Sequence, residues 1–167
     1  MSDSVGLARL FAFIFGFSGL LFIIVATPTH HWFVYKMKNN DTIYGGIWEN
    51  CRQDTDGMYS CSNLQTTDWL NAVKAFLIIA IILYLFVVLY LIMMVWGKGM
   101  TVRFIGIDLL FAAMFGVIAM SVYTGKYHLK PGYEYGWSYV LGWSGSIATV
   151  VSGVLCFFAD VDYEPVR

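Results

Sequence analysis

The chain has 167 residues, of which 59% are hydrophobic, 18% aromatic and 13% charged, and its mean hydropathy is +0.66. This composition lies outside the range of ordinary soluble domains and predicts an integral membrane protein. The formal net charge of −1 offers no basic surface for phosphates, which excludes nucleic-acid binding.

Four apolar stretches are long enough to cross a bilayer, which requires about 20 mostly apolar residues. The first is expected to remain as a helix, because its apolar run exceeds the about 7–15 residues of a signal-peptide core and no Ala-x-Ala pattern follows it. Short connections make consecutive helices antiparallel. A single tetraspan domain is predicted, an all-α membrane protein with helices over residues 8–27, 70–96, 103–124 and 136–159.

The orientation of the spans is predicted from two covalent signals. The count of Lys and Arg does not decide it, because four fall on the side of the termini and six on the other. Asn40 begins an Asn-Asp-Thr glycosylation sequon, and Cys51 with Cys61 suits a disulfide; both modifications belong to the secretory lumen. Loops 28–69 and 125–135 are therefore expected outside the cell, and the tail 160–167 in the cytoplasm.

The first loop is predicted to form a small antiparallel sheet of three strands. Apolar and aromatic groups at 32–35, at 43–48 and at 58–59 alternate with Asn, Asp and Gly turn residues. So small a sheet needs a disulfide and contact with the helix ends to be stable. The pair Cys51 and Cys61 would contribute about 2–3 kcal/mol. We expect Trp32 and Trp48 to seat the sheet on the bundle, the alternative being that they anchor a partner.

No catalytic or metal site is predicted. His30 and His31 are adjacent, so in an extended strand they would point to opposite faces and not chelate one metal. Zinc would also need the cysteines as thiolates. The carboxylates of the loop are scattered among turn residues, and no nucleophile, metalloprotease or phosphate-loop motif occurs. We expect a non-enzymatic protein without a cofactor.

Asp108 is the acidic residue within the third apolar stretch. A carboxylate costs about 2.5–3.5 kcal/mol at the centre of a membrane helix, so it needs a partner or a proton. We expect a salt bridge or hydrogen bond near the helix end, with Arg9, Lys98 or Arg103 in reach. The alternative is an element of an ion pathway or conformational switch.

Small residues recur at four-residue spacing in the last two spans. They are Ala112 and Gly116 in the third, and Ser138, Gly142 and Ser146 in the fourth. Such rows let helix backbones approach closely, which is a main source of attraction within lipid. They are expected to pack the bundle, the alternative being contacts between copies of the chain.

The loop residues Trp32, Gly46-Ile47-Trp48, Cys51 and Cys61 resemble the Trp, Gly-Leu-Trp, Cys, Cys signature of the claudin and peripheral myelin protein superfamily of tetraspan junction proteins, with Ile47 in place of leucine. The branch of peripheral myelin protein, the epithelial membrane proteins and the lens fibre intrinsic membrane protein is most similar. Motifs at three helix ends carry that likeness, namely Asp68–Phe76, Val122–Gly125 and Gly136–Trp143. The resemblance implies a left-handed four-helix bundle with a small extracellular antiparallel sheet, to which residues 126–135 add a strand.

The function expected from these features is the organisation of cell–cell contacts or membrane apposition. The extracellular sheet would associate laterally (in cis) and in trans with other copies or with another membrane protein, through apolar residues such as Phe33, Tyr35, Met58 and Tyr59. The bilayer itself is the other partner. The expected location is the plasma membrane, at cell–cell junctions, with both termini cytoplasmic. The alternative is an auxiliary subunit of a channel, or a paracellular pore former whose loop charges set ion selectivity.

Overall fold

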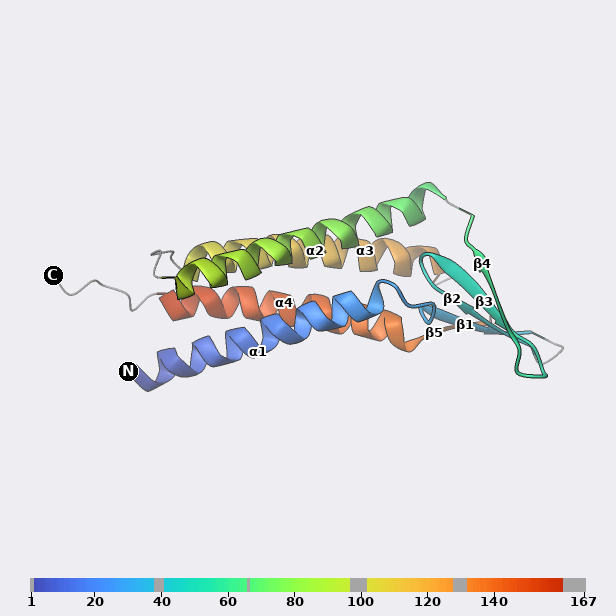
Figure 1. The fold of residues 1–167 in the computed structure, drawn as a ribbon, viewed down its shortest axis with the longest axis horizontal. Coiled ribbons are helices and arrows are strands. Elements are labelled where there is room, and N and C mark those ends of the chain that lie inside the picture. Colours follow the sequence, from blue (N-terminus) through green and yellow to red (C-terminus); the bar gives the residue numbers. More distant parts are fainter. Residues whose placement is uncertain (1, 38–40, 66, 97–101, 128–131, 161–167) are drawn as a thin grey trace.

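The computed structural model describes residues 2–37, 41–65, 67–96, 102–127 and 132–160. Four helices lie side by side along its long axis, and a small sheet lies at one end of the bundle (Figure 1). Each helix is long and apolar enough to cross a membrane. The predicted fold class, a four-helix transmembrane bundle with a small antiparallel sheet, is confirmed. The helices are α1 (Ser2–Ala26), α2 (Asp68–Val95), α3 (Val102–Tyr127) and α4 (Trp137–Asp160).

The helix ends are set by polar residues beyond the apolar stretches. The carbonyl of Thr67 accepts the first helical hydrogen bond of α2 from the amide of Asn71, at 3.0 Å. Asp68 lies in the first turn, where a carboxylate is favourable beside the positive end of the helix dipole. At the end of α1, the Thr27 hydroxyl donates to the carbonyl of Ile23 at 2.7 Å, and Pro28 follows, which cannot continue the hydrogen-bond ladder. Helix α1 begins and α4 ends at the same end of the bundle (Figure 1). The loops that form the sheet therefore lie at the opposite end.

The helices pack as a chain of neighbours. Helix α4 packs against both α1 and α3, and α3 packs against α2, while α1 and α2 make few contacts with each other. Glycines allow the closest approaches: a Cβ on Gly145 would lie 3.1 Å from the carbonyl oxygen of Gly19, and one on Gly106 would lie 3.1 Å from that of Gly153. Such backbone contact stabilises helix pairs within lipid.

The sheet has five antiparallel strands in the order β4-β3-β2-β1-β5. The expectation of three strands in the first loop is therefore wrong. The apolar residues Ile47 and Trp48 lie in a bend, and the polar segment after them forms β3. Strand β5 lies within residues 126–135, the segment expected from the family resemblance to add a strand, and pairs with β1. The strands are β1 (Phe33–Lys36), β2 (Thr42–Gly45), β3 (Glu49–Gln53), β4 (Tyr59–Asn63) and β5 (Tyr133–Tyr135).

Candidate functional site

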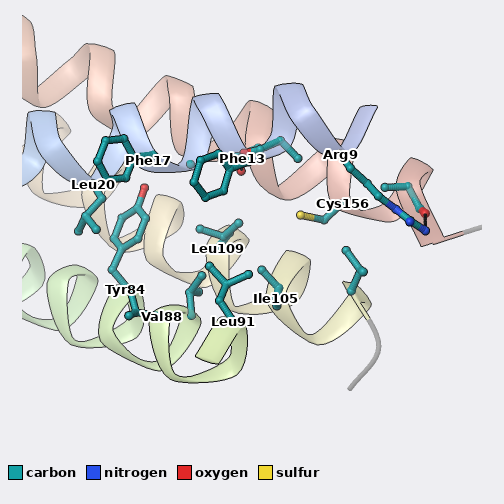
Figure 2. Close-up of a pocket in the computed structure, with 16 residues that line it drawn as sticks. Arg9, Phe13, Phe17, Leu20, Tyr84, Val88, Leu91, Ile105, Leu109 and Cys156 are labelled. Atoms are coloured by element: carbon teal, nitrogen blue, oxygen red, sulfur yellow. Dashed lines mark hydrogen bonds between the residues drawn. The ribbon is translucent and has the colours of Figure 1, made fainter. Parts of the chain in front are cut away.

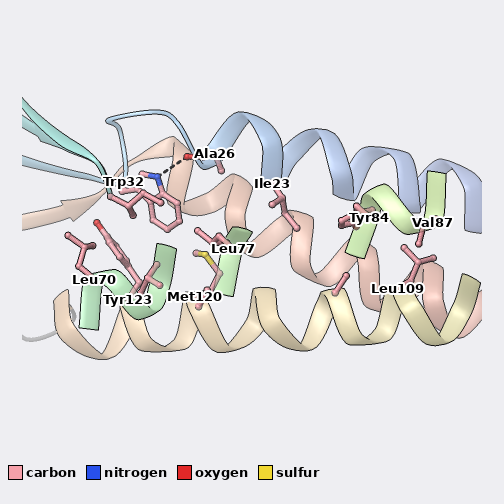
Figure 3. Close-up of a cluster of buried hydrophobic side chains, with 14 of the residues drawn as sticks. Ile23, Ala26, Trp32, Leu70, Leu77, Tyr84, Val87, Leu109, Met120 and Tyr123 are labelled. Carbon is pink, nitrogen blue, oxygen red and sulfur yellow. Dashed lines mark hydrogen bonds between the residues drawn. The ribbon is translucent and has the colours of Figure 1, made fainter. Parts of the chain in front are cut away.

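Trp32 connects the sheet to the bundle and is fully buried, with an exposed fraction of 0%. Its indole Nε1 donates to the carbonyl of Ala26 at the end of α1, at 2.8 Å, and its ring lies 4.8 Å from that of Tyr123 in α3 (Figure 3). Its backbone amide donates to Gly45, and its carbonyl accepts from Gly136, the residue before α4. The indole cannot reach a partner molecule, so the alternative of a binding anchor is wrong for Trp32.

Gly46 brings the chain back against the end of α1. Its amide donates to the carbonyl of Glu49 at 2.9 Å. A Cβ here would lie 2.7 Å from the carbonyl oxygen of Thr29 and 2.8 Å from the Cα of His30. Both are backbone atoms and cannot rotate away, so glycine is required. The next residue, Ile47, has an exposed fraction of 0% and extends the core of the bundle beneath the sheet.

Trp48 follows and lies across the ends of two helices. Its Nε1 donates to the carbonyl of Thr27, the first residue after α1, at 2.9 Å. The Lys74 ammonium of α2 lies 4.9 Å from the centroid of the indole ring, within cation–π range. The indole is 41% exposed, as suits an amphipathic ring at a membrane interface.

Cys51 and Cys61 form a disulfide and are paired directly opposite each other in β3 and β4. Cys51 is fully buried, while all five residues of β4 are exposed. The bond therefore ties an exposed strand at the sheet edge to the centre of β3.

The bundle and its sheet agree with the comparison to known families. The model of the PMP-22/EMP/MP20/Claudin family matches residues 3–156. The chain belongs to this family. It is therefore a multi-pass, non-enzymatic membrane protein of a junction-related kind.

Relatives within the family share about a quarter of their residues with this chain. The p53 apoptosis effector related to PMP-22 of Danio rerio is 28% identical over 141 residues, which cover 81% of this chain and 75% of that protein. Epithelial membrane protein 1 of Homo sapiens is 27% identical over 150 residues, covering 86% and 90%. Claudin-15 of Rattus norvegicus is 26% identical over 174 aligned residues, covering 88% and 76%. The similarity therefore includes both bundle and sheet.

In this claudin-family chain, the expected ion partner of Asp108 is not found among the described residues. No ion pair joins it to Arg9 or Arg103 among the described residues, and Lys98 lies outside them. Its Oδ2 is buried without a hydrogen-bond partner. The side chain is half-buried on α3.

The five small residues lie between helices. A Cβ on Gly116 would lie 2.7 Å from the Ser146 hydroxyl, and one on Gly142 would lie 2.6 Å from the Met120 sulfur. The hydroxyl of Ser138 accepts a hydrogen bond from Thr29 at 2.7 Å. All five are buried, and so all lie in packing positions within the bundle: Ala112, Gly116, Ser138, Gly142 and Ser146.

The histidine pair is arranged differently from expectation. The rings of His30 and His31 lie 4.5 Å apart, because the two residues occupy the bend before β1 and not an extended strand. His30 Nδ1 lies 3.7 Å from Glu49 Oε1, and both are near the Cys51 sulfur. That sulfur is bonded to Cys61 and is not a thiolate, so the cluster offers two ligands where zinc takes three or four. The sequon residue Asn40 lies outside the described residues.

The exposed apolar residues of the sheet are fewer than expected. Phe33 is buried, because its ring covers Gly45 of the neighbouring strand. Tyr35 is half-buried and stacks on Tyr133 of β5, with ring centroids 4.8 Å apart. Met58 and Tyr59 are 72% and 56% exposed. Of the four residues expected to contact a partner, these two, just before and at the start of β4, are the exposed ones.

The charges of the sheet divide into paired and exposed groups. Asp41 is buried and accepts hydrogen bonds from Nε and Nη2 of Arg52, the former at 3.0 Å. This contact raises the pKa of Arg52 above its usual value. Asp54 and Asp56 are exposed in the turn between β3 and β4, where Gly57 has a φ of 79°. The tip of the hairpin therefore carries two exposed carboxylates.

Gly136 is a functional residue whose role was missed at the sequence level. Its amide donates to the carbonyl of Trp32 at 3.0 Å, and a Cβ there would collide with the carbonyl of His31. The approach of the chain to α4 therefore needs glycine. The signal in the sequence is the Gly-Trp pair at the start of the last apolar stretch, which did not by itself indicate a contact with the first loop.

Proposed function

We propose that this protein organises cell–cell contacts or membrane apposition through lateral and trans association of its sheet. The observation that carries the proposal is the open edge at β4, where all five residues are exposed. An exposed edge strand presents unpaired backbone donors and acceptors and is a template for pairing with another chain.

The hydrogen bonds at the two ends of the hairpin define which groups face that edge. The amide of Asp54 donates to the carbonyl of Met58 at 3.0 Å, and the amide of Leu64 donates to that of Trp48 at 3.1 Å. In an antiparallel ladder, alternate residues pair toward the neighbouring strand. Residues 60 and 62 therefore pair with β3, and the backbone groups of Tyr59, Cys61 and Asn63 face outward.

Side chains beside this edge suit an interface. Met58 and Tyr59 are the exposed apolar residues at the start of β4, and Met and Tyr are enriched at protein interfaces. The Tyr59 ring is stacked on Tyr44 with centroids 6.2 Å apart, which limits the entropy lost when a partner binds.

The proposal places the sheet outside the cell, with both termini cytoplasmic and the protein in the plasma membrane at cell–cell junctions. Its support is the disulfide, since such bonds persist in oxidising compartments, together with the sequon at Asn40. Glycosidase treatment is expected to shift the protein to lower mass on a gel, and Asn40→Gln is expected to abolish that shift.

Substitution at the edge tests the association directly. Asn63→Pro removes an outward-facing amide without breaking the ladder to β3, because proline is tolerated at strand edges. Asn63→Ala keeps the amide and is the matched control. Non-adherent cells that express the wild type or Asn63→Ala are expected to aggregate, while cells with equal surface levels of Asn63→Pro do not. Equal aggregation of all three would contradict pairing through β4.

A second candidate function, a cation-selective paracellular pore, is favoured by the exposed carboxylates of Asp54 and Asp56, while Arg52 is paired with Asp41. An auxiliary channel subunit belongs to the same alternative. Charge reversal to Asp54→Lys with Asp56→Lys is expected to change the ratio of sodium to chloride permeability across an epithelial layer if a pore forms. An unchanged permeability ratio would contradict a pore whose selectivity is set by these carboxylates.

A further inference from the structure

A groove of about 270 Å³ lies between α1 and α2, in the half of the bundle nearer the termini. All four helices contribute to its wall (Figure 2). In Figure 2, Leu20 and Tyr84 lie at its inner end and Arg9 at its outer end, with Phe13 and Leu109 between them. The groove therefore runs along the helices, from mid-bundle to the end where α1 begins.

The groove exists because α1 is held against α4 and not against α2. A Cβ on Gly16 would lie 2.8 Å from the Ser152 hydroxyl, and one on Gly19 would lie 2.7 Å from that of Thr149. Both glycines thus allow α1 to approach α4, while α1 and α2 make few contacts. The space between α1 and α2 is a consequence of this packing.

The wall of the groove is apolar, because its hydroxyl groups are bound within the protein. Ser152 Oγ donates to the carbonyl of Ala12 at 2.6 Å, and the Tyr84 hydroxyl is hydrogen-bonded to Thr149. Aliphatic and aromatic side chains form the rest of the wall. A polar ligand would lose hydrogen bonds to water here without replacement, so the wall suits a hydrocarbon chain.

The length of the groove matches one leaflet. Arg9 and Leu20 are eleven residues apart on α1, which corresponds to about 16 Å at a rise of about 1.5 Å per residue. Half of the hydrocarbon core of a bilayer is about 15 Å. The volume is a little below the about 300–1,000 Å³ of sites that enclose drug-sized ligands, which favours a slender chain over a rigid ring system.

Arg9 supplies charge complementarity at the outer end. Its Nη2 lies 3.4 Å from the carbonyl oxygen of Ala159, the last residue in the wall on α4. A guanidinium has five donors and matches the geometry of a phosphate. We propose that the groove holds one acyl chain of an anionic phospholipid from the leaflet on the side of the termini, with its phosphate at Arg9. This site is independent of the proposed function of the sheet.

Photo-crosslinking in nanodiscs tests the site with the full-length protein. The nanodiscs contain equal amounts of phosphatidylserine and phosphatidylcholine, and one or the other carries a trace of diazirine in its acyl chain. Crosslinked peptides are expected to concentrate on the groove residues Val87, Val88 and Leu109. Labelling by phosphatidylserine is expected to exceed that by phosphatidylcholine about fivefold, the ratio for one cation near a headgroup.

Two pairs of variants separate a specific site from bulk lipid. Arg9→Gln is expected to bring the headgroup ratio close to one, while Arg103→Gln, which removes a charge from α3 outside the groove, leaves it unchanged. Val88→Trp is expected to abolish groove labelling by both lipids by filling the space. Leu89→Trp, on the adjacent lipid-facing position of α2, is the matched control.

Several results would overturn the proposal. Labels spread evenly over the outer faces of the helices would mean bulk lipid alone. If phosphatidylserine and phosphatidylcholine labelled the wild type equally, the preference for an anionic headgroup would be contradicted. This measurement does not depend on the folding of any variant. If Arg9→Gln and Arg103→Gln reduced the preference for phosphatidylserine equally, that preference would come from general surface charge. If Arg9→Gln left the preference unchanged, Arg9 would not bind the headgroup.

Discussion

The indole Nε1 of Trp48 donates a hydrogen bond to the backbone carbonyl of Thr27, 2.9 Å away. Thr27 is the first residue after α1, and the Lys74 ammonium of α2 lies over the ring of Trp48. One side chain from the connection between β2 and β3 thus contacts both helices that flank the first loop. Because α1 and α2 make few contacts with each other, this contact helps to define how the sheet sits on the bundle.

Trp48→Phe is expected to weaken that contact while keeping an aromatic ring. The carbonyl of Thr27 loses its donor and the cation–π attraction falls, at a cost of about 1 kcal/mol. The melting temperature of the protein in detergent is expected to fall by about 2–4 °C. Trp96→Phe, at an exposed tryptophan on the other end of the bundle, is the control. Equal melting of wild type and Trp48→Phe would show that the hydrogen bond contributes nothing.

Gly46→Ala is expected to destabilise the sheet, because the added methyl would meet the backbone of Thr29 and His30. Overpacking of this kind costs about 1–3 kcal/mol. Gly125→Ala in α3 is the control: its Cβ would meet no described atom within 4 Å, and alanine favours a helix. Thermal unfolding and surface expression are the measurements. A Gly46→Ala protein as stable as Gly125→Ala would refute the close approach.

Removal of the disulfide by Cys51→Ser with Cys61→Ser is expected to loosen β4 before the rest of the sheet. The loss of the cross-link costs about 2–3 kcal/mol of unfolding free energy, and β4 lies at the edge, paired with β3. Hydrogen exchange is expected to speed up at residues 59–63 and to change little in β1 and β5. Uniform acceleration across all five strands would show instead that the bond supports the whole sheet.

His31 is expected to make stability depend on pH. Burial, with a smaller effect of the neighbouring His30, lowers the pKa of His31 below its ordinary 6.5. The unfolded chain therefore takes up a proton first as the pH falls below about 6.5, and the free energy of unfolding decreases with pH until the folded state is also protonated. Above that pH both states are neutral, and the effect is absent.

The melting temperature between pH 7 and pH 5 measures this dependence. The wild type is expected to lose more stability over that interval than His31→Gln. His30→Gln is expected to reduce the dependence without abolishing it, because burial is the larger cause of the shift. A steeper loss in His31→Gln than in the wild type would contradict the assigned sign.

The four spans could be predicted from the sequence because a bilayer core imposes a minimum apolar length on a helix. The same criterion does not by itself fix the first residue of α2. Asp68 and the Thr67 carbonyl begin that helix through the dipole and a backbone hydrogen bond, and neither is visible in an apolar run. The seating of the sheet by tryptophan was predictable in kind, since an indole combines an apolar ring with a donor.

Features that depend on distant parts of the chain were not predictable. Strand β3 has a polar sequence with a single buried residue, Cys51, so no alternating apolar pattern marks it, and its partners β2 and β4 specify it. The burial of Phe33 depends on the missing side chain of Gly45 in the opposite strand. The lack of a hydrogen-bond partner at Asp108 Oδ2 depends on how the helices pack around α3. Each requires the tertiary structure.

The most direct test of the central claim, association of the sheet between opposed cells, is imaging of a tagged form in mixed cultures of expressing and non-expressing cells. The account predicts that the protein concentrates at borders between two expressing cells and not at borders with a non-expressing cell. A uniform distribution over the surface of expressing cells would contradict trans association and leave lateral partners as the function of the open β4 edge.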